Sequence, residues 1–272
     1  MSGLIRFTGK EFELLINYMK VHYGIDLSKK RVIAECRMSQ EMEKNGITSL
    51  KQYMEMMEAD RTGRMRAALL NRLTTNYTYF MREPKHFEFL EQNILPDIRP
   101  ETAKSPFRVW SAGCSSGEEC YTLAMLLQNY TDGGGFLPSF EILGTDLSES
   151  VIGKAKEGRY PISELDVIPL FWQQKYCRKE KDKGSFTIIP KLTEKVRFQI
   201  MNLLRPNVGI ERFDLILCRN VMIYFDDASR KKLIENLNRA LKPGGYLFVG
   251  HTELLPRDQE LLTYVRPAVY RK

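Results

Sequence analysis

The sequence predicts an α/β protein in which a Rossmann-like, mostly parallel sheet follows a helical domain. Three segments predict the sheet, because each is a short apolar strand that runs into a turn and then a helical pattern; they begin at residues 107, 141 and 213. Alternating strands and helices form parallel sheets, which bind ligands at the carboxyl ends of their strands. Residues 1–83 show helical spacing alone, so we expect a helical domain at 1–83 and the α/β domain at 84–272.

The helical domain is predicted from caps and apolar spacing. Thr8 and Glu11 have the spacing of a capping box, and apolar residues then recur at helical intervals until Gly24, a typical stop. Ser49 can cap a later helix, and a further helix is expected near residues 62–75. Many of the inward positions are methionines, which we interpret as core-filling residues of a small bundle.

The first sheet segment, residues 107–119, combines a strand, a glycine turn and a helix start. Gly113 and Gly117 allow a sharp turn and a close approach to a ligand, while Glu118 and Glu119 lie in the first helical turn. Two carboxylates disfavour a diphosphate, and the pattern is not Gly-x-Gly-x-x-Gly, so a dinucleotide is not expected. A ligand with a cationic centre or several hydroxyls fits better. The alternative is an ordinary turn that binds nothing.

The second and third segments place polar side chains at the same edge. Asp146 ends the strand at 141–146, where a carboxylate can hold the vicinal hydroxyls of a ribose; the alternative is a turn or capping role. Arg219 and Asn220 follow the apolar strand that begins at Phe213. These residues therefore predict a ligand site at the carboxyl edge.

The remaining chain completes the α/β domain. Residues 158–195 interrupt the alternation, and residues 185–189 and 196–200 read as strands. Lys-Pro-Gly-Gly at 242–245 predicts the end of a helix, with a strand at 246–250 after it, and residues 263–271 predict the closing strands.

Composition bounds the class of protein. No apolar run approaches the roughly 20 residues that span a bilayer, and the beginning of the chain lacks a secretory pattern. Five cysteines form no Cys-x-x-Cys pair, so we expect neither disulfides nor a metal site, and a reducing, cytoplasmic location. The net charge is +7, and residues 1–85 hold 15 Lys and Arg against 10 Asp and Glu. This excess favours an acidic partner, either nucleic acid or protein, or is simply a solvated helical surface.

Four stretches together are similar to one family. In order, they are TTNYTYFMR at 74–82, WSAGCSSGEE at 110–119, CRNVMIYFD at 218–226 and GHTE at 250–253. They resemble the chemotaxis receptor methyltransferases, the CheR family. The resemblance implies an S-adenosylmethionine-dependent methyltransferase sheet with an N-terminal helical domain and a small β-subdomain inserted at about 158–195. It also implies methyl transfer from S-adenosylmethionine to receptor glutamate carboxylates, which gives glutamate methyl esters and S-adenosylhomocysteine.

The resemblance also implies the site residues. Arg82 and Tyr224 are expected to be catalytic, Arg82 through its planar fork for a carboxylate and Tyr224 through a hydroxyl or ring face near the sulfonium. The residues expected to bind the cofactor are Asn76, Thr78, Arg82, Gly113, Glu119, Asp146, Asn202, Leu203, Arg219 and Asn220. His22 and His86 are interpreted as structural, and His251 as a local hydrogen-bonding residue.

The expected partner is the cytoplasmic helical region of chemotaxis receptors, contacted through Arg31 and Arg37. Family members often carry a row of arginines there, which Gln40, Glu41 and Glu43 interrupt in this chain. Two alternatives are a nucleic-acid methyltransferase and a cofactor-binding regulatory or sensing module. The chain lacks the Asp/Asn-Pro-Pro-Tyr/Phe stretch of amino-methylating enzymes, so we expect no nucleic acid as partner. We also expect no insertion into a membrane, because no apolar run is long enough, and take a monomer as the default.

Overall fold

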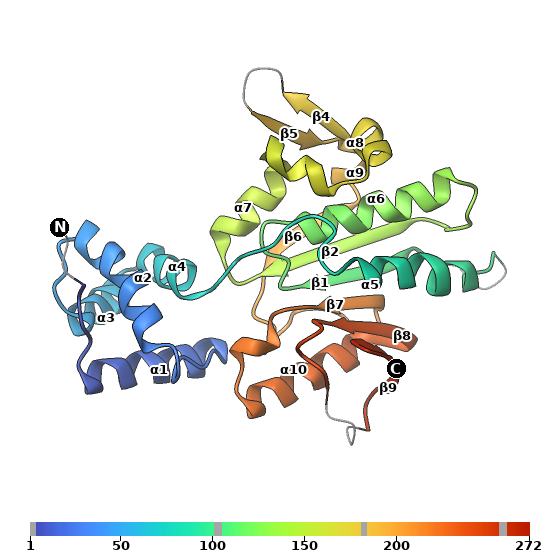
Figure 1. Ribbon diagram of the computed structural model, residues 1–272. Helices are drawn as coiled ribbons and strands as arrows, with labels where there is room; N and C mark the ends of the chain where they lie inside the picture. Colours follow the sequence, from blue (N-terminus) through green and yellow to red (C-terminus); the bar gives the residue numbers. More distant parts are fainter. Residues whose placement is uncertain (1–3, 101–104, 181–183, 256–259) are drawn as a thin grey trace. The chain divides into compact units, whose positions relative to one another are not determined.

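The computed structural model describes residues 4–100, 105–180, 184–255 and 260–272. These residues form two compact units (Figure 1). The first comprises the chain up to Asn76 together with Ile223–Lys232, and the second comprises Tyr77–Met222 and Leu233–Lys272. The helix α10 (Asp227–Ala240) begins in the first unit and ends in the second.

The first unit is helical, as predicted. Its helices are α1 (Gly9–Tyr23), α2 (Arg31–Lys44), α3 (Leu50–Ala59) and α4 (Arg64–Leu73). The capping box of Thr8 and Glu11 forms in full, and Gly24 ends α1 at φ 72°, which favours glycine. The Ser49 side chain caps α3 by accepting from the Gln52 N–H. Met19, Met38, Met42 and Met57 are buried, which confirms that these methionines fill the core.

The second unit is built on a seven-stranded sheet in the order β6-β2-β1-β7-β8-β10-β9 (Figure 1). Its strands are β1 (Phe107–Ala112), β2 (Phe140–Asp146), β6 (Val196–Ile200), β7 (Phe213–Cys218), β8 (Leu241–Val249), β9 (Thr263–Arg266) and β10 (Val269–Arg271). The first five strands in the sheet order are parallel, and β10 and β9 are antiparallel. The predicted α/β class and the closing strands at 263–271 are therefore confirmed.

Apolar side chains on both faces of this sheet form its core. Val109 of β1 and Leu215 of β7 are fully buried in one cluster with Leu123 and Leu127 of α6 (Glu118–Asp132). Continuous burial along β1 and β7 is typical of a parallel sheet covered by helices. The other helices of the unit are α5 (Pro84–Phe89), with Pro84 in its first turn as predicted, α7 (Glu149–Glu157), η1 (Leu90–Ile94) and η2 (Leu95–Asp97).

A separate three-stranded antiparallel sheet interrupts the α/β alternation. It has the order β3-β5-β4, with β3 (Arg159–Pro161), β4 (Cys177–Glu180) and β5 (Ser185–Ile188), and is joined by η3 (Ile162–Val167), α8 (Leu170–Tyr176) and α9 (Pro190–Thr193). Tyr160, Phe186 and Tyr176 anchor it in the main core. The predicted strand at 196–200 is β6, which pairs with β2 at the edge of the large sheet.

The beginning of β8 differs from the prediction. The strand starts at Leu241, which pairs with Phe213, and the Lys-Pro-Gly-Gly stretch lies inside it at a register irregularity. A Cβ atom on Gly245 would lie 2.9 Å from the Lys242 carbonyl oxygen and 3.1 Å from the Asp214 carbonyl oxygen. The glycine therefore permits a close backbone approach within the strand, where the sequence predicted the end of a helix.

Candidate active site

The turn after β1 is tied to the end of β2. The N–H groups of Gly113 and Cys114 donate to the Thr145 carbonyl oxygen at 2.8 and 2.9 Å. Gly113 has φ 92°, and a Cβ atom there would lie 2.3 Å from Cγ2 of Val221. Ser115 is left-handed at φ 49°, and its N–H donates to Asp146 Oδ2 at 3.0 Å. The turn is therefore a fixed backbone concavity between the two strands where they end.

Asp146 combines a structural role with acceptor capacity for a ligand. Besides the Ser115 N–H, its carboxylate accepts the Ser148 N–H at 3.0 Å. Burial raises the pKa of Asp146, and these backbone donors oppose the rise. A carboxylate has about four acceptor sites, so capacity for hydroxyl groups remains. The predicted ribose role and the alternative capping role are compatible in one side chain.

The two carboxylates at the start of α6 have different surroundings. Glu119 accepts from Ser111 Oγ at 2.6 Å and from Arg219 Nε at 2.6 Å, so its charge is balanced by a guanidinium. Glu118 is 3% exposed and accepts from Ser116 Oγ, and burial raises its pKa to about 7. The site is thus less acidic than the two adjacent glutamates in the sequence indicate.

Arg219 and Asn220 follow β7 and take up buried contacts. The Arg219 side chain is 3% exposed, and its Nη1 donates to the Arg82 carbonyl oxygen at 2.7 Å. Asn220 has φ 59°, and its N–H donates to Glu253 Oε2 at 2.5 Å. The Gly250 N–H donates to the same oxygen at 3.0 Å, which joins the ends of β7 and β8.

Arg82 lies in a segment with unusual backbone angles. Met81 and Glu83 on either side of it are left-handed, at φ 60° and φ 56°. Its Nη1 donates to the Tyr77 carbonyl oxygen at 2.8 Å, and its guanidinium carbon lies 5.8 Å from the centre of the Tyr79 ring. Thr78 lies half-buried in this segment. The Arg82 guanidinium is therefore held over aromatic rings without an acidic partner among the described residues.

Asn202 and Leu203 follow β6. The Met201 N–H donates to the Asp146 carbonyl oxygen at 2.9 Å, which holds this turn against the end of β2. Asn202 Oδ1 accepts the Leu204 N–H at 2.9 Å, and Leu203 is buried. The pair thus offers an amide and an apolar side chain beside Asp146.

Two predicted residues, Asn76 and Tyr224, belong to the first unit. Asn76 is half-buried, and Tyr224 lies in η4 (Met222–Tyr224). The Tyr224 carbonyl oxygen accepts the Asp26 N–H at 2.8 Å, and Lys30 Nζ lies 4.2 Å from the centre of its ring. One face of the Tyr224 ring therefore lies against the Lys30 ammonium group.

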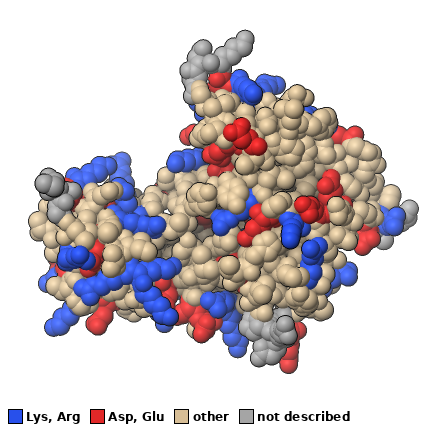
Figure 2. Space-filling model, viewed as in Figure 1, with Lys and Arg blue, Asp and Glu red and all other residues tan. Residues whose placement is uncertain are grey.

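Arg31 and Arg37, predicted to meet a partner, both have contacts within the first unit. Arg31 Nε pairs with Glu35 Oε1 at 3.1 Å, and Arg37 donates to the Thr74 carbonyl oxygen at 3.2 Å. Arg31 also donates to the Phe7 carbonyl oxygen. Exposed α2 residues include Val32 and Ile33. Figure 2 shows many Lys and Arg side chains over the helices of this unit.

A cluster that the sequence did not indicate lies behind Arg219. Glu83, His86 and His251 bring their ligand atoms within 4.8 Å of one another, an arrangement that can hold a metal ion. Arg219 Nη1, however, lies 3.5 Å from Glu83 Oε2 and 3.3 Å from His86 Nδ1, so the guanidinium supplies the positive charge there. The His251 N–H faces Glu83 Oε1 at 3.5 Å, in line with its predicted local role. Glu83 and His86 have a Glu-x-x-His spacing that could have drawn attention to them, but no spacing rule connects them with His251.

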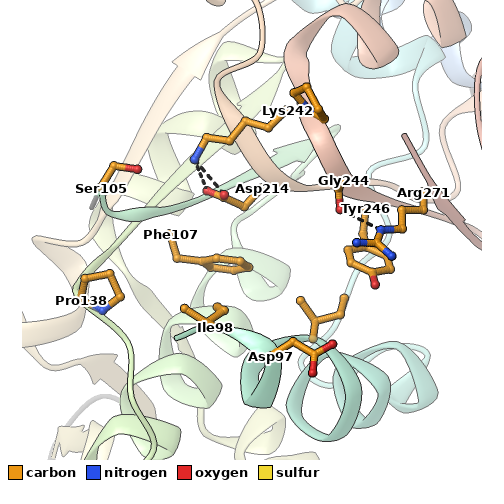
Figure 3. A pocket seen from close by; sticks show the side chains of 13 residues that line it. Asp97, Ile98, Ser105, Phe107, Pro138, Asp214, Lys242, Gly244, Tyr246 and Arg271 are labelled. Atoms are coloured by element: carbon orange, nitrogen blue, oxygen red, sulfur yellow. Dashed lines mark hydrogen bonds and ion pairs between the residues drawn. The ribbon is translucent and has the colours of Figure 1, made fainter. Parts of the chain in front are cut away.

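A hollow of about 400 Å³ lies at the opposite, amino-terminal edge of the strands (Figure 3). It is lined by Phe107, Tyr246 and the ion pair of Asp214 with Lys242, whose Nζ lies 2.8 Å from both carboxylate oxygens. None of the predicted site residues lies in it. The predicted site residues of the second unit lie instead at the carboxyl ends of the parallel strands, near the point between β1 and β7 where the strand order reverses.

Comparisons with known proteins agree with this arrangement. Residues 10–74 match the family model described as CheR methyltransferase, all-alpha domain, and residues 76–270 match CheR methyltransferase, SAM binding domain. The chain is 38% identical to a chemotaxis protein methyltransferase of Borreliella burgdorferi, over 98% of this chain and 96% of that protein. It is 33% identical to chemotaxis protein methyltransferase 1 of Pseudomonas aeruginosa, over 90% of each chain. It is also 33% identical to the chemotaxis protein methyltransferase of Salmonella typhimurium, over 93% of this chain and 86% of that protein. With a carboxyl-edge site and both domain models matched in order, the chain belongs to the CheR methyltransferase family.

Proposed function

We propose that this protein transfers a methyl group from S-adenosylmethionine to glutamate side chains of chemotaxis receptors and forms methyl esters. The observation that carries the proposal is the fixed turn between β1 and β2, with Asp146 beside it and Glu119 behind it. Curated relatives matched over most of their length are named chemotaxis protein methyltransferases, which supports the substrate class.

The residues present fit S-adenosylmethionine. Asp146 keeps acceptor capacity for the vicinal ribose hydroxyls. Gly113 lets Val221 pack directly against the turn, because a Cβ atom there would lie 2.3 Å from Val221 Cγ2. Glu119, paired with Arg219, offers a carboxylate for the amino group of the methionyl end. Leu203 and Asn202 offer an apolar surface and an amide for the adenine.

S-adenosylmethionine supplies, when bound, a methyl group on a positively charged sulfur. A glutamate side chain is ionised at neutral pH, because its usual pKa is about 4.3, so the chain does not need to supply a general base. What remains is to align the carboxylate with the methyl group and to exclude water.

We assign the alignment of the carboxylate to Arg82. Its planar guanidinium can donate two parallel hydrogen bonds to one carboxylate. Its contacts among the described residues are a carbonyl oxygen and two aromatic rings, so no acidic side chain there neutralises its charge. The contact must position the nucleophile without full neutralisation, because a tightly paired carboxylate is less reactive. Tyr224 is proposed as the second catalytic residue through its ring face or hydroxyl.

The partner proposed is the cytoplasmic helical region of the receptors, which places the reaction in the cytoplasm. Among the described residues, no helix is long and apolar enough to cross a membrane. The excess of basic residues at 1–85 fits an acidic helical substrate. Because Arg31 and Arg37 have internal contacts, we propose that they contribute charge to the docking surface while their side chains also hold the first unit together.

The test uses methyl-labelled S-adenosylmethionine and a receptor cytoplasmic fragment, followed by mild base. Label should transfer to the fragment and leave it as volatile methanol, because methyl esters hydrolyse in base. A fragment with its glutamates replaced by glutamine is the matched control and should accept no label. Base-stable label, label on added nucleic acid, or cofactor binding without any transfer would each contradict the proposal.

A further inference from the structure

One buried guanidinium at the end of β7 joins three parts of the second unit. Arg219 Nε donates to Glu119 Oε2 of α6 at 2.6 Å, and Nη1 donates to the Arg82 carbonyl oxygen at 2.7 Å. Nη1 also lies 3.5 Å from Glu83 Oε2, and the guanidinium carbon lies 5.2 Å from the centre of the Phe87 ring. With 3% of its side chain exposed, Arg219 has little surface left for a ligand.

We infer that the Arg219 side chain is a positioning group that holds Glu119 and the Arg82 segment in their working places, and that this side chain does not itself contact the cofactor. The inference rests on the proposed function, because Glu119 is the proposed contact of the cofactor's amino end and Arg82 that of the receptor carboxylate. Arg219 is then the physical connection between the cofactor side and the substrate side of the site.

The backbone around Arg82 requires such an anchor. Met81 and Glu83 are non-glycine residues in the left-handed region, a strained conformation that persists only when the surroundings hold it. The Arg82 carbonyl oxygen between them accepts from Arg219, and the Met81 N–H donates to Thr122 Oγ1 of α6 at 3.2 Å. The segment is thus fixed from β7 and from α6, and loss of the first contact lets the Arg82 guanidinium drift.

The charges around Arg219 suit a guanidinium and disfavour an ammonium group. Glu119 and Glu83 approach Arg219 from different elements. The several N–H donors of a planar guanidinium can face both carboxylates at once, whereas the compact ammonium group of a lysine cannot. His86 is buried, and burial, followed by the charge of Arg219, lowers its pKa to about 3. The neutral ring can therefore accept from Arg219 Nη1 through Nδ1, at 3.3 Å, and it stacks on His251 at 5.0 Å.

If the inference holds, the effect of Arg219→Lys on turnover should depend on Arg82, and its effect on cofactor affinity should depend on Glu119. Turnover at saturating substrate should fall by about tenfold, which corresponds to about 1.4 kcal/mol, because Arg82 is no longer aligned. In an Arg82→Ala background, the same substitution should change turnover by less than about twofold, since the group that it positions is gone. The cofactor dissociation constant should rise in the otherwise unchanged protein and stay constant in a Glu119→Gln background.

The experiment measures initial rates with the receptor fragment and S-adenosylhomocysteine binding by calorimetry for these variants. Arg271→Lys, at the other edge of the sheet, is the matched control and should leave both unchanged. An equal turnover loss with and without Arg82 would show a general structural effect, and a loss of affinity that persists with Glu119→Gln would show direct contact; either overturns the inference. If Arg219→Lys does not fold, Glu83→Gln provides the same test, because Glu83 lies beside the Arg219 guanidinium. We expect Glu83→Gln to lower turnover by a smaller factor, and to have no effect on turnover in an Arg82→Ala background. If the wild type binds the cofactor but methylates no receptor fragment, the proposed function fails, and the affinity measurements still test Arg219.

Discussion

Asp146 holds two backbone donors and is the proposed contact of the ribose, so Asp146→Asn perturbs both roles by a measurable amount. Asparagine keeps one acceptor oxygen and replaces the other by a donor, which cannot accept the N–H of Ser115 or Ser148. A lost hydrogen bond to a charged group costs about 1.5–3 kcal/mol. Because burial raises the pKa of Asp146, the neutral side chain recovers part of this cost, and we expect a net destabilisation of about 1 kcal/mol.

The effect on the cofactor should be larger. A ribose held through two hydroxyls loses one charge-assisted hydrogen bond in Asp146→Asn, about 1.5–3 kcal/mol, which raises the dissociation constant by roughly 10- to 150-fold. Asp146→Ala loses both and should abolish measurable binding, at about 3–6 kcal/mol.

Calorimetric titration with S-adenosylhomocysteine and urea unfolding measure the two effects separately. Asp214→Asn is the matched control, because this carboxylate pairs with Lys242 at the amino-terminal edge of the same sheet (Figure 3). The control should lose stability and keep its affinity. If Asp146→Asn loses stability and binds S-adenosylhomocysteine as the wild type does, Asp146 is only a turn residue and the ribose assignment is wrong.

Three further predictions test other parts of the account. Arg82→Ala should lower turnover far more than cofactor affinity, with Arg82→Lys intermediate because it lacks the fork; initial rates and calorimetry decide, and the reverse pattern would reassign Arg82 to the cofactor. Burial raises the pKa of Glu118 to about 7, so the folded state keeps a proton that the unfolded state releases near its usual value, and this stability is lost as pH rises from about 4.5 to about 7. Glu118→Gln should therefore gain about 3 kcal/mol relative to wild type as the pH rises between these values in urea unfolding, and a pH-independent difference would contradict this cause. Gly117→Ala places a side chain at φ 96°, 2.9 Å from the Ala155 Cβ atom, and should cost about 1–3 kcal/mol, whereas Gly153→Ala in α7, with open space around it, should gain about 0.5–1 kcal/mol. Equal thermal shifts for the two glycines would refute the strain argument.

The features that could be predicted from the sequence are set by short-range interactions or by strand order. The capping box of Thr8 and Glu11 closes within three residues, and Gly24 ends its helix through its own backbone angle. The position of Asp146 at the carboxyl edge of the sheet could be predicted, because the carboxyl ends of parallel strands lie at one edge whatever the length of the chain between them.

The features that could not be predicted depend on partners far along the chain. Arg219 pairs with Glu119, 100 residues away, so its burial cannot be read from its place after a strand. Arg37 donates to a carbonyl oxygen 37 residues away, which turns an expected surface charge into an internal contact. Glu83 and His86 are three residues apart, as ligands on one helical turn can be, but they meet Arg219 and His251 only through the tertiary fold.

Peptide mapping of a receptor cytoplasmic fragment by mass spectrometry, after incubation with this protein and S-adenosylmethionine, tests the central claim most directly. The account predicts that glutamate-containing peptides gain the mass of one methylene group per event, that mild base reverses the gain, and that Asp146→Asn reduces it at limiting cofactor. A receptor fragment that gains no mass while the protein binds the cofactor, or gains that map to other residues and resist base, would contradict glutamate methylation.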